Sequence, residues 1–309
     1  MRSFFKILKH FIAASRPKTL PAGISPIIIG ASLSLKDHLH NSTEIDFKFY
    51  STFVEILICG LAIQILCNFV NDLWDYKKGA DTKDRIGPTR MVQAGLIKPE
   101  AMYKAILLLT FLILMLGAHL SLIGGTTILL IGIFSILGAY AYTAGPYPLA
   151  YNGLGEIFVF FFFGPVPVYG TYYLLNGESN FQTLLPGFLI GAIATALLIV
   201  NNIRDINEDV LSNKMTIAVK LGKKFSQTLF VILIFLPIIG APILLSFPST
   251  TLLASNLPLL AVLILTAFPA YITNKLLSAV TGKDYNLLLG KVGQFMIIFA
   301  ITFSTLILL

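Results

Sequence analysis

The sequence is poor in charged residues, in cysteine and in histidine. Asp, Glu, Lys and Arg make up 12% of its 309 residues, which is about half the share found in a soluble domain. The two cysteines, Cys59 and Cys67, lie in one apolar run with no other cysteine in the chain, which argues against a disulfide framework or a thiolate metal site. The four histidines are scattered and form no ligand set, which argues against zinc, haem or a catalytic histidine.

Nucleotide-binding glycine motifs are also missing. The chain has no G-x-x-x-x-G-K-[ST], and no G-x-G-x-x-G follows a strand and opens a helix, so the common nucleotide-binding folds are excluded. The composition is instead apolar, with 56% hydrophobic residues and a mean hydropathy of +0.83. The net charge of +7 requires no nucleic-acid partner, because the basic residues follow a membrane topology.

Apolar stretches of about 20 residues, the length that crosses a bilayer, recur along the whole chain. We count nine of them: 19–35, 51–70, 103–119, 122–141, 154–174, 183–203, 225–246, 252–274 and 291–309. Eight or ten spans also fit, because the Gly124-Gly125 connection and the Pro-rich break around Pro237 are ambiguous. The sequence therefore predicts an all-α polytopic protein embedded in a lipid bilayer, with residues 1–309 as a single domain.

Basic residues gather on one side of these spans. Of the 22 Lys and Arg residues, 20 lie in residues 1–18, in 71–104, in 204–224 and around the last connection. The positive-inside rule then places the N-terminus and both long connections in the cytoplasm. Residues 1–18 mix five basic residues with apolar ones, and we expect them to form a basic amphipathic helix on the membrane surface.

The first of the long connections begins with an acid-rich helical face. Asn68, Asp72 and Asp75 are spaced i, i+4 and i+7 at the end of an apolar run, so in a helix all three point the same way. Carboxylates beside basic residues suit a divalent ion and its polyanion, because Mg²⁺ is usually held by one or two carboxylates plus substrate phosphates. The alternative is a solvated loop between two helices. Further charged residues follow directly: Lys77, Lys78, Asp81, Lys83, Asp84, Arg85 and Arg90.

A second copy of this pattern favours a function over a solvated loop. Asn202, Asp205 and Asp209 lie at i, i+3 and i+7 in N-N-I-R-D-I-N-E-D, again at the end of a long apolar run and on one helical face. Arg204 and Lys214 accompany them. The two copies are four predicted spans apart, which suggests two related four-helix halves. They lie near span ends, whereas a secondary transporter is expected to bind its cargo near the midplane.

The connection between the fourth and fifth spans is rich in tyrosine and contains no Lys or Arg. Tyrosines at this depth are ordinarily interfacial anchors. In the alternative, rings such as those of Tyr142 and Tyr151 line a cavity and stabilise a cation through their faces. The sequence leaves both open. Glu55 and Glu156 sit near predicted span ends and indicate no proton relay through the membrane.

These motifs resemble the intramembrane aromatic prenyltransferases of the UbiA type, and the resemblance extends over most of the chain. Four stretches carry it: R-P-K-T-L-P-A at 16–22, N-D-x-x-D-x-x-K-G-x-D-x-x-D-R-I-G-P-x-R at 71–90, Y-x-G-L-G-E at 151–156 and N-N-x-R-D-I-x-x-D-x-x-x-x-K-x-T at 201–216. They are similar to the branch that prenylates 1,4-dihydroxy-2-naphthoate in the menaquinone pathway. One departure is Gly79, where many relatives have a third Asp, and the next acid here is Asp81.

The resemblance implies nine transmembrane helices around a central cavity, closed by a cytoplasmic polar cap of residues 71–102 and 204–224 and open sideways to lipid. It also implies two Mg²⁺ ions that bind a polyprenyl diphosphate, with the oxygen ligands Asn68, Asp72, Asp75, Asn202, Asp205 and Asp209. Basic side chains would stabilise the departing diphosphate: Lys83, Arg85, Arg90, Arg204 or Lys214. Candidates for contact with the acceptor or the allylic cation are Asp81, Asp84, Tyr142 and Tyr151.

The implied reaction is transfer of a polyprenyl chain to 1,4-dihydroxy-2-naphthoate with loss of its carboxylate, which yields demethylmenaquinol. Another acceptor, such as 4-hydroxybenzoate, homogentisate or haem, is the alternative within the family. An ion-coupled membrane carrier is the alternative from another class. The lack of a long transit segment suggests a bacterial cytoplasmic membrane or its archaeal counterpart. Nothing in the sequence indicates an oligomeric state.

Overall fold

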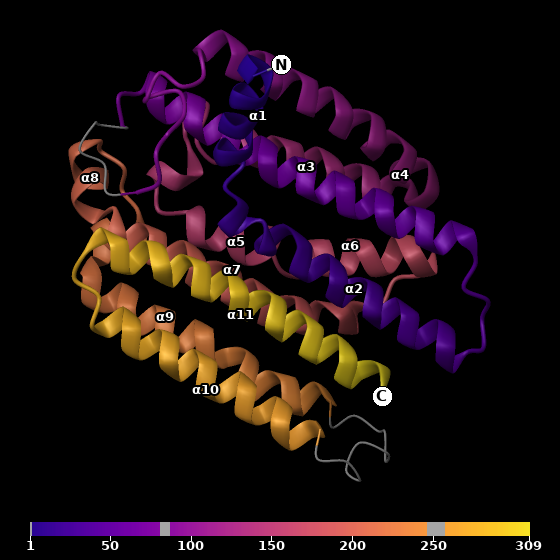
Figure 1. The fold of residues 1–309 in the computed structure, drawn as a ribbon. Coiled ribbons are helices and arrows are strands. Elements are labelled where there is room, and N and C mark those ends of the chain that lie inside the picture. The colour runs from indigo at the N-terminus through magenta and orange to yellow at the C-terminus, as the bar shows by residue number, and fades with distance from the viewer. Residues whose placement is uncertain (1, 81–86, 246–256) are drawn as a thin grey trace.

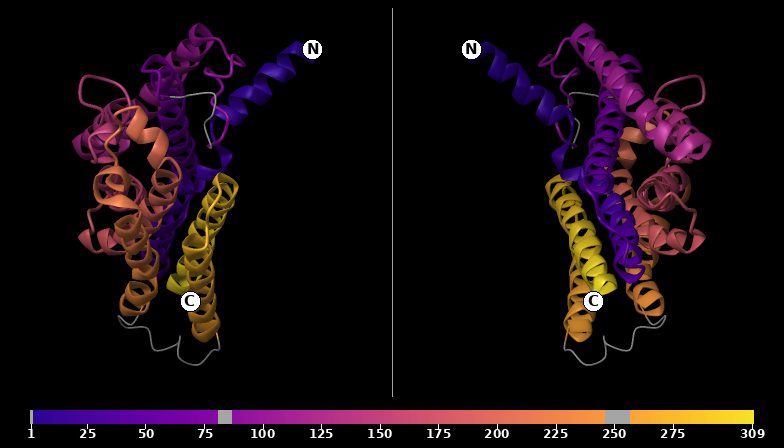
Figure 2. Two further views of the ribbon diagram at one scale, coloured as in Figure 1. Left: turned by 90° about the vertical axis from the view of Figure 1, so that its left-hand side faces the viewer. Right: turned by 90° about the vertical axis from the view of Figure 1, so that its right-hand side faces the viewer.

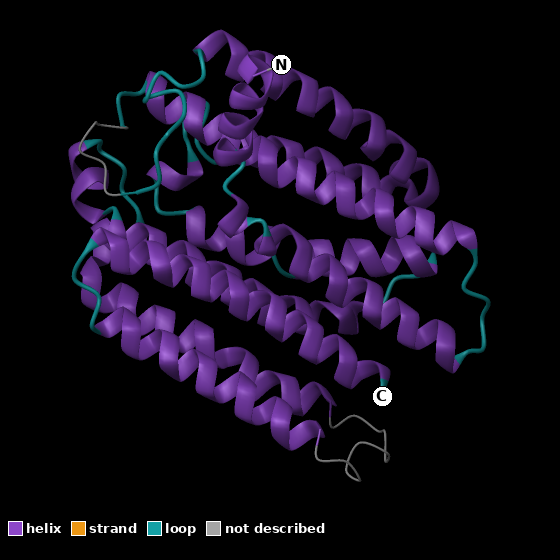
Figure 3. Cartoon of the chain, viewed as in Figure 1, coloured by secondary structure: helices purple, strands orange, loops and turns teal. Residues whose placement is uncertain are grey.

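The computed structural model describes residues 2–80, 87–245 and 257–309, and every regular element within them is a helix (Figures 1 and 3). This confirms the all-α prediction. Helices suit the apolar runs because each satisfies its own backbone hydrogen bonds, as a membrane interior requires. The helices are α1 (Arg2–Ala14), α2 (Pro21–His40), α3 (Phe47–Lys77), α4 (Pro99–Ala141), α5 (Gly155–Phe162), α6 (Pro165–Asn176), α7 (Leu184–Arg204), α8 (Ile206–Leu211), α9 (Ile217–Leu245), α10 (Leu257–Leu277) and α11 (Gly282–Leu308), with 3-10 turns at Pro17–Thr19, Leu149–Tyr151 and Phe181–Thr183.

The first helix, α1, leans away from the rest of the bundle (Figure 2). Its apolar side chains Phe5, Ile7 and Ile12 are 55%, 50% and 53% exposed. The ring of Phe11 lies 5.7 Å from that of Phe69 on α3, so the C-terminal half of α1 is attached to the bundle. A helix with an exposed apolar face beside the bundle has the form expected of a segment that lies on a membrane.

α4 is a helical hairpin rather than one straight rod. Its 43 residues would extend over roughly 64 Å if straight, about twice the thickness of a hydrocarbon core. Gly125 has φ 63° and ψ −154°, a backbone conformation that strains any residue with a side chain. The hydroxyls of Thr110 and Tyr140 lie 2.7 Å apart, so the two arms run side by side. The predicted spans 103–119 and 122–141 correspond to these arms.

The predicted span 154–174 is broken into α5 and α6. The break at Gly164 packs against α7, where a Cβ on Gly164 would lie 2.6 Å from the carbonyl oxygen of Gly187. Likewise, a Cβ on Gly191 would lie 2.3 Å from the carbonyl oxygen of Phe160. Two glycines four positions apart on α7 therefore let the broken span approach closely, as small residues do in membrane helix pairs generally.

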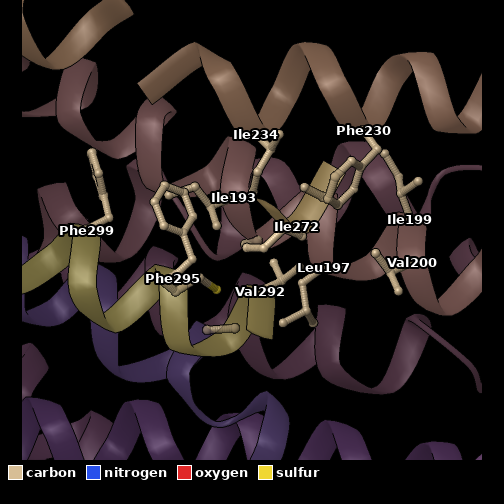
Figure 4. Close-up of a cluster of buried hydrophobic side chains, with 14 of the residues drawn as sticks. Ile193, Leu197, Ile199, Val200, Phe230, Ile234, Ile272, Val292, Phe295 and Phe299 are labelled. Carbon is tan, nitrogen blue, oxygen red and sulfur yellow. The ribbon is translucent and has the colours of Figure 1, made fainter. Parts of the chain in front are cut away.

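α7 is the central helix of the C-terminal half and packs against α5, α6, α9 and α11. A cluster of buried apolar side chains fills the space between α7, α9, α10 and α11, with Phe230, Phe295 and Phe299 among its fully buried members (Figure 4). α9 is kinked at Gly222, which has φ 83° and ψ 168°, and it is helical through Pro237, so the break considered at that proline is not found. This packing holds the C-terminal end of α7, which carries the second acid-rich motif.

Six spans in the described part of the chain are long and apolar enough to cross a membrane: α3, α4, the α5–α6 pair, α7, α9 and α11. The pair formed by residues 7–19 and α2, bent by 58°, adds a seventh if it is counted as one span. The count is lower than the nine predicted because α4 counts once, α2 counts only within the bent pair and α10 is not counted. A protein with this many apolar spans is integral to a membrane.

The two acid-rich motifs meet at one end of the bundle. α3 and α7 end there, and α4, α5 and α9 begin there, on the left side of Figure 1. The C-terminus lies at the opposite end of α11 (Figure 1). Motifs that are separated by more than a hundred residues in sequence are therefore neighbours in the fold.

Candidate functional site

The first acid-rich motif occupies the last turns of α3. Asn68, Asp72 and Asp75 are 6%, 2% and 2% exposed, so the face defined by their spacing points into the protein. The Asn68 amide donates to the Ser15 carbonyl oxygen at 2.9 Å. This hydrogen bond ties the end of α3 to the segment that follows α1.

The Asp72 carboxylate holds the connection after α3 in place. Its Oδ2 accepts from the Met91 backbone N–H and its Oδ1 from the Val92 backbone N–H, each at 3.0 Å. A buried carboxylate requires such donors because burying it without them is costly. The chain therefore folds back over the end of α3 and brings Arg90 beside the motif.

Asp75 has two side-chain partners. Arg90 Nη2 donates to its Oδ2 at 2.9 Å, and both side chains are 5% exposed or less. The hydroxyl of Tyr151, in the connection before α5, donates to Oδ1 at 2.8 Å. Removing one partner of a buried ion pair leaves an uncompensated charge. As long as no ligand replaces one of them, Arg90 and Asp75 therefore each compensate the charge of the other.

Tyr151 links the first motif to the second. Its backbone carbonyl accepts from the Met215 N–H at 3.0 Å, next to the second motif. The Nζ atoms of Lys78 and Lys214 lie 4.3 and 5.8 Å from the centre of its ring, distances at which a cation and an aromatic ring attract each other. Burial lowers the pKa of the Lys78 amine, and the negative charge of Asp75 opposes that shift.

The second acid-rich motif spans the junction of α7 and α8. The predicted single helical face is interrupted, because α7 ends at Arg204 and α8 starts at Ile206. Asn202, Asp205 and Asp209 are nevertheless 4%, 2% and 5% exposed. The break in the helix changes the direction of the chain without exposing any of the three side chains.

Arg204 is held among protein groups. Its Nε and Nη2 donate to the two oxygens of Asp205 at 2.6 and 2.8 Å. The same guanidinium donates to the side-chain oxygens of Asn201 and Asn286, both at 2.8 Å. A planar guanidinium bonded on several sides fixes its partners in position, so Arg204 orients Asp205 and attaches it to α11.

Asp209 has one carboxylate oxygen that accepts no hydrogen bond. Oδ1 pairs with Lys214 Nζ at 3.4 Å, whereas Oδ2 is buried without a partner among the residues the structure describes. Burial raises the pKa of the Asp209 carboxyl to about 6, with the charges of Asp205 and Asp75 adding to the rise and Lys214 opposing it. A buried unsatisfied oxygen in a field of like charges is a position that a cation would stabilise.

The donor set of the two motifs suits a hard divalent ion. It offers carboxylate and amide oxygens, which are the ligands that Mg²⁺ prefers, and the Oδ2 of Asp209, which has no partner within the described part of the chain, is one open position. In residues 2–80, 87–245 and 257–309, no three His, Cys, Asp or Glu side chains converge on one point. The carboxylates are held instead by Arg90, Arg204, Lys214 and backbone N–H groups.

A cavity of about 260 Å³ adjoins the two motifs and extends into the bundle. Its motif end is polar and is lined by Arg16, Asn68, Asn71, Arg90, Tyr142, Glu156, Asn201, Asn202, Lys214 and Thr216. Farther in it is apolar and is lined by residues such as Ile56, Ile63, Leu120, Ile128, Ile131, Phe158, Phe162 and Leu174. Ile56 precedes Asn68 by twelve residues, so the cavity reaches roughly 18 Å along α3.

The structure places the predicted site residues in three groups. Five line the cavity: Asn68, Arg90, Tyr142, Asn202 and Lys214. Six pack around its polar end without lining it: Asp72, Asp75, Tyr151, Arg204, Asp205 and Asp209. Four lie outside the described residues: Asp81, Lys83, Asp84 and Arg85.

Two charged cavity residues have no predicted role from the sequence. Arg16 lines the polar end and has a left-handed backbone conformation, with φ 53°. Glu156 lines the cavity from the first turn of α5 and is 4% exposed. Both belong to stretches that carry the family resemblance, R-P-K-T-L-P-A and Y-x-G-L-G-E, so the sequence marks them as candidates. That their side chains line a cavity follows only from the fold.

Fold and site together define an integral membrane protein with an acid-rich end above a cavity that is polar at one end and apolar at the other. Such a cavity suits a ligand with a charged head and a hydrocarbon tail. Residues 24–303 match the UbiA prenyltransferase family, and this chain belongs to that family.

Relatives of known activity include several bacterial enzymes. The chain is 37% identical over 220 residues to 1,4-dihydroxy-2-naphthoate octaprenyltransferase of Escherichia coli, covering 69% of this chain and 68% of that protein. It is 35% identical over 221 residues to the enzyme of the same name from Haemophilus influenzae, covering 70% of each. Among solved structures, a UbiA homolog from Archaeoglobus fulgidus bound to GPP and Mg²⁺ superimposes with a TM-score of 0.65, at 14% identity, over 97% of this chain and 100% of that one. That likeness shows the fold.

Proposed function

We propose that this protein transfers a polyprenyl chain from polyprenyl diphosphate to 1,4-dihydroxy-2-naphthoate with loss of the acceptor's carboxylate, which gives demethylmenaquinol in menaquinone biosynthesis. The observation that carries the proposal is the cavity, which is polar beside two buried carboxylate motifs and apolar at its other end. A polyprenyl diphosphate has the same two ends. The bacterial relatives named for this reaction support the choice of acceptor.

The two motifs would hold divalent ions, which we take to be Mg²⁺. The ligands would be Asp72, Asp75, Asp205 and Asp209, with Asn68 and Asn202 as neutral oxygen donors. Bound ions of this kind supply electrostatic stabilisation of the negative charge that builds up on a leaving diphosphate. The buried Oδ2 of Asp209, for which the described residues offer no partner, supports this role, as does the Mg²⁺ bound to the homolog of the same fold.

Arg90 and Lys214 are the cations best placed to meet the diphosphate. Both line the polar end of the cavity, and each already pairs with a motif carboxylate. They would therefore remain beside the diphosphate and stabilise its developing charge. We assign Arg204 to positioning Asp205, because its guanidinium is surrounded by protein acceptors. Lys83 and Arg85 remain proposed diphosphate contacts from the sequence.

The reaction requires no proton to leave the ring. The C–O bond of the prenyl diphosphate breaks, and its electron pair departs with the diphosphate. The ring carbon that bears the carboxylate then bonds to the allylic carbon. Loss of CO₂ returns the electron pair of the C–C bond to the ring and restores aromaticity. The apolar lining around Phe158 and Phe162 would keep water away from the allylic cation.

In the membrane, the chain would form nine spans. The two arms of α4 count separately, and α2 and α10 join the α5–α6 pair, α3, α7, α9 and α11. The basic residues on the motif side would place the N-terminus and the polar cap, residues 71–102 and 204–224, in the cytoplasm. We place the protein in the cytoplasmic membrane of a bacterium, in keeping with its bacterial relatives.

A product assay tests this function. Protein purified in detergent is given Mg²⁺, a polyprenyl diphosphate and either 1,4-dihydroxy-2-naphthoate or 4-hydroxybenzoate, and the products are read by mass spectrometry. We expect prenylation of the naphthoate. If only 4-hydroxybenzoate is prenylated, the assignment as a prenyltransferase holds and the assignment of the acceptor is wrong. Failure with every aromatic acceptor, in folded protein, would reject the enzyme and favour a carrier.

A further inference from the structure

Glu156 stands apart from the other buried charges. Among the residues described, it is the one buried acid that belongs to neither acid-rich motif. It lies in the first turn of α5, is 4% exposed and lines the cavity. Ionisable side chains within membrane spans are costly, and they mark functional positions by default. Its role therefore has to be sought in the cavity.

The Glu156 carboxylate is held by neutral donors, namely the Asn202 side chain and the backbone N–H groups of Glu156 and Ile217, and the charge of Lys214 acts on it. Its Oε1 accepts from Asn202 Nδ2 at 2.9 Å. Within residues 2–80, 87–245 and 257–309, it forms no ion pair, whereas Asp75 and Asp205 each pair with an arginine. These contacts hold the carboxylate between α5, α7 and the start of α9. Glu156 and Lys214 also both line the cavity, so the carboxylate is fixed in a position that a ligand can reach.

Its position is the boundary between the polar and apolar parts of that cavity. Glu156 and Val159 on α5 and Phe163, directly after its last residue, all line the cavity. The rings of Phe158 and Phe162, which also line it, are stacked with centroids 4.3 Å apart. A carboxylate and an aromatic surface therefore line the same cavity, an arrangement that fits a flat aromatic molecule carrying a hydrogen-bond donor at its edge.

We propose that Glu156 binds the aromatic acceptor by accepting a hydrogen bond from one of its phenolic hydroxyls. The proposal rests on the proposed function, because it assumes that the cavity takes a hydroxylated aromatic acceptor. An ionised carboxylate has no proton to donate, so a hydroxyl is the complementary group. The contact holds the ring against α5.

The same hydrogen bond would assist the chemistry. A charge-assisted hydrogen bond to the hydroxyl increases electron density on the ring, which favours attack on an allylic cation. The hydroxyl keeps its proton, so the contact leaves the balance of the reaction unchanged. Like charges repel, so Glu156 also turns the acceptor's own carboxylate away from α5.

Acceptor binding without turnover tests the proposal. Glu156→Gln keeps the size of the side chain and an oxygen for Asn202, and removes the charge. Binding of 1,4-dihydroxy-2-naphthoate and of 2-naphthoate, which lacks both hydroxyls, is measured by calorimetry under nitrogen without prenyl diphosphate. We expect the variant to bind the dihydroxy compound about ten- to a hundredfold more weakly and to bind 2-naphthoate no more weakly than the wild type does. Glu100→Gln, an exposed acid in the first turn of α4, is the matched control.

Two results would overturn the proposal: unchanged affinity for the dihydroxy compound, or equal weakening of both ligands. If Glu156→Gln fails to fold, Glu156→Asp replaces it and should show the same hydroxyl-dependent loss. If the wild-type protein binds 4-hydroxybenzoate and no naphthoate, the proposed acceptor is wrong, but the role of Glu156 is still open. Binding of 4-hydroxybenzoate and of benzoate to the wild type and to Glu156→Gln would then test that role.

Discussion

The Tyr151 hydroxyl donates a hydrogen bond to Asp75 Oδ1 at 2.8 Å across 76 positions of sequence. The connection before α5 is thereby tied to the first motif, and its backbone bond to Met215 ties it to the second. Lys78 and Lys220 add hydrogen bonds from the two sides to the same connection, at the carbonyl oxygens of Thr143 and Asn152. The carboxylates are therefore oriented by protein contacts before any ligand arrives, which is what preorganisation of a metal site requires.

Removing that hydroxyl should weaken metal binding. We expect Tyr151→Phe to lower the apparent affinity for Mg²⁺ about tenfold, because groups that orient metal-bound carboxylates are typically worth ten- to a hundredfold. The rate at saturating Mg²⁺ should change less. The metal affinity is measured in two ways: from the rate of prenyl transfer as a function of Mg²⁺ concentration, and from Mn²⁺ binding followed by electron paramagnetic resonance. Tyr147→Phe, whose ring is 63% exposed, is the control, and equal metal affinity in both variants would show that Tyr151 does not position Asp75.

Asp209→Asn should separate activity from stability. The substitution removes a buried charge whose Oδ2 has no partner among the described residues, but it also removes the ion pair with Lys214, so we expect thermal stability to change little. Prenyl transfer should fall by about a hundredfold or more, as when one electrostatic stabiliser of a transition state is removed. Product formation and the thermal midpoint are measured on the same preparation. A variant that loses stability and activity together would assign Asp209 to the fold rather than to the ion.

Close packing at Gly191 should make that position intolerant of a single methyl group. Its Cβ would lie 2.3 Å from the Phe160 carbonyl oxygen, so Gly191→Ala forces α5 and α7 apart. We expect a loss of about 1–3 kcal/mol in the free energy of unfolding, the usual effect of overpacking. Gly290→Ala on α11, where no atom lies within 4 Å of the new Cβ, should be neutral or slightly stabilising. Equal behaviour of the two variants in detergent unfolding would contradict the packing.

Filling the apolar part of the cavity should shorten the prenyl chain that is accepted. Gly132 lines the cavity, and a Cβ there meets no atom within 4 Å, so Gly132→Phe places a ring in free space. We expect geranyl diphosphate to remain a substrate while longer polyprenyl diphosphates react more slowly, since overfilling a packed space is unfavourable. Ile133→Phe, at a position 43% exposed, should leave the preference unchanged. An unaltered preference in Gly132→Phe would exclude this region as the binding site of the tail.

Local regularities made part of this structure predictable. The spacing of Asn68, Asp72 and Asp75 placed them on one face because a helix brings i, i+4 and i+7 together, and all three are buried. The two arms of α4 were foreseen because Gly124-Gly125 interrupts an apolar run that is too long for one span. In both cases a few adjacent residues determine the outcome.

Contacts between distant segments were not predictable in this way. The break at Gly164-Pro165 follows a run of phenylalanines that reads as part of one continuous span, and α7 accommodates it with Gly187 and Gly191. Glu156 was placed at a span end, yet its burial depends on Asn202, 46 positions later. Tyr151 could be named as a candidate, but its partner Asp75 follows from the fold alone.

Release of the acceptor's carboxylate tests the central claim most directly. 1,4-Dihydroxy-2-naphthoate labelled with ¹³C in the carboxyl group is incubated with the protein, Mg²⁺ and a polyprenyl diphosphate, and labelled CO₂ and prenylated naphthol are counted together. We predict one labelled CO₂ for each prenylated product, and neither when Mg²⁺ is chelated. Prenylated product that retains the label, or labelled CO₂ without prenyl transfer, would contradict the account.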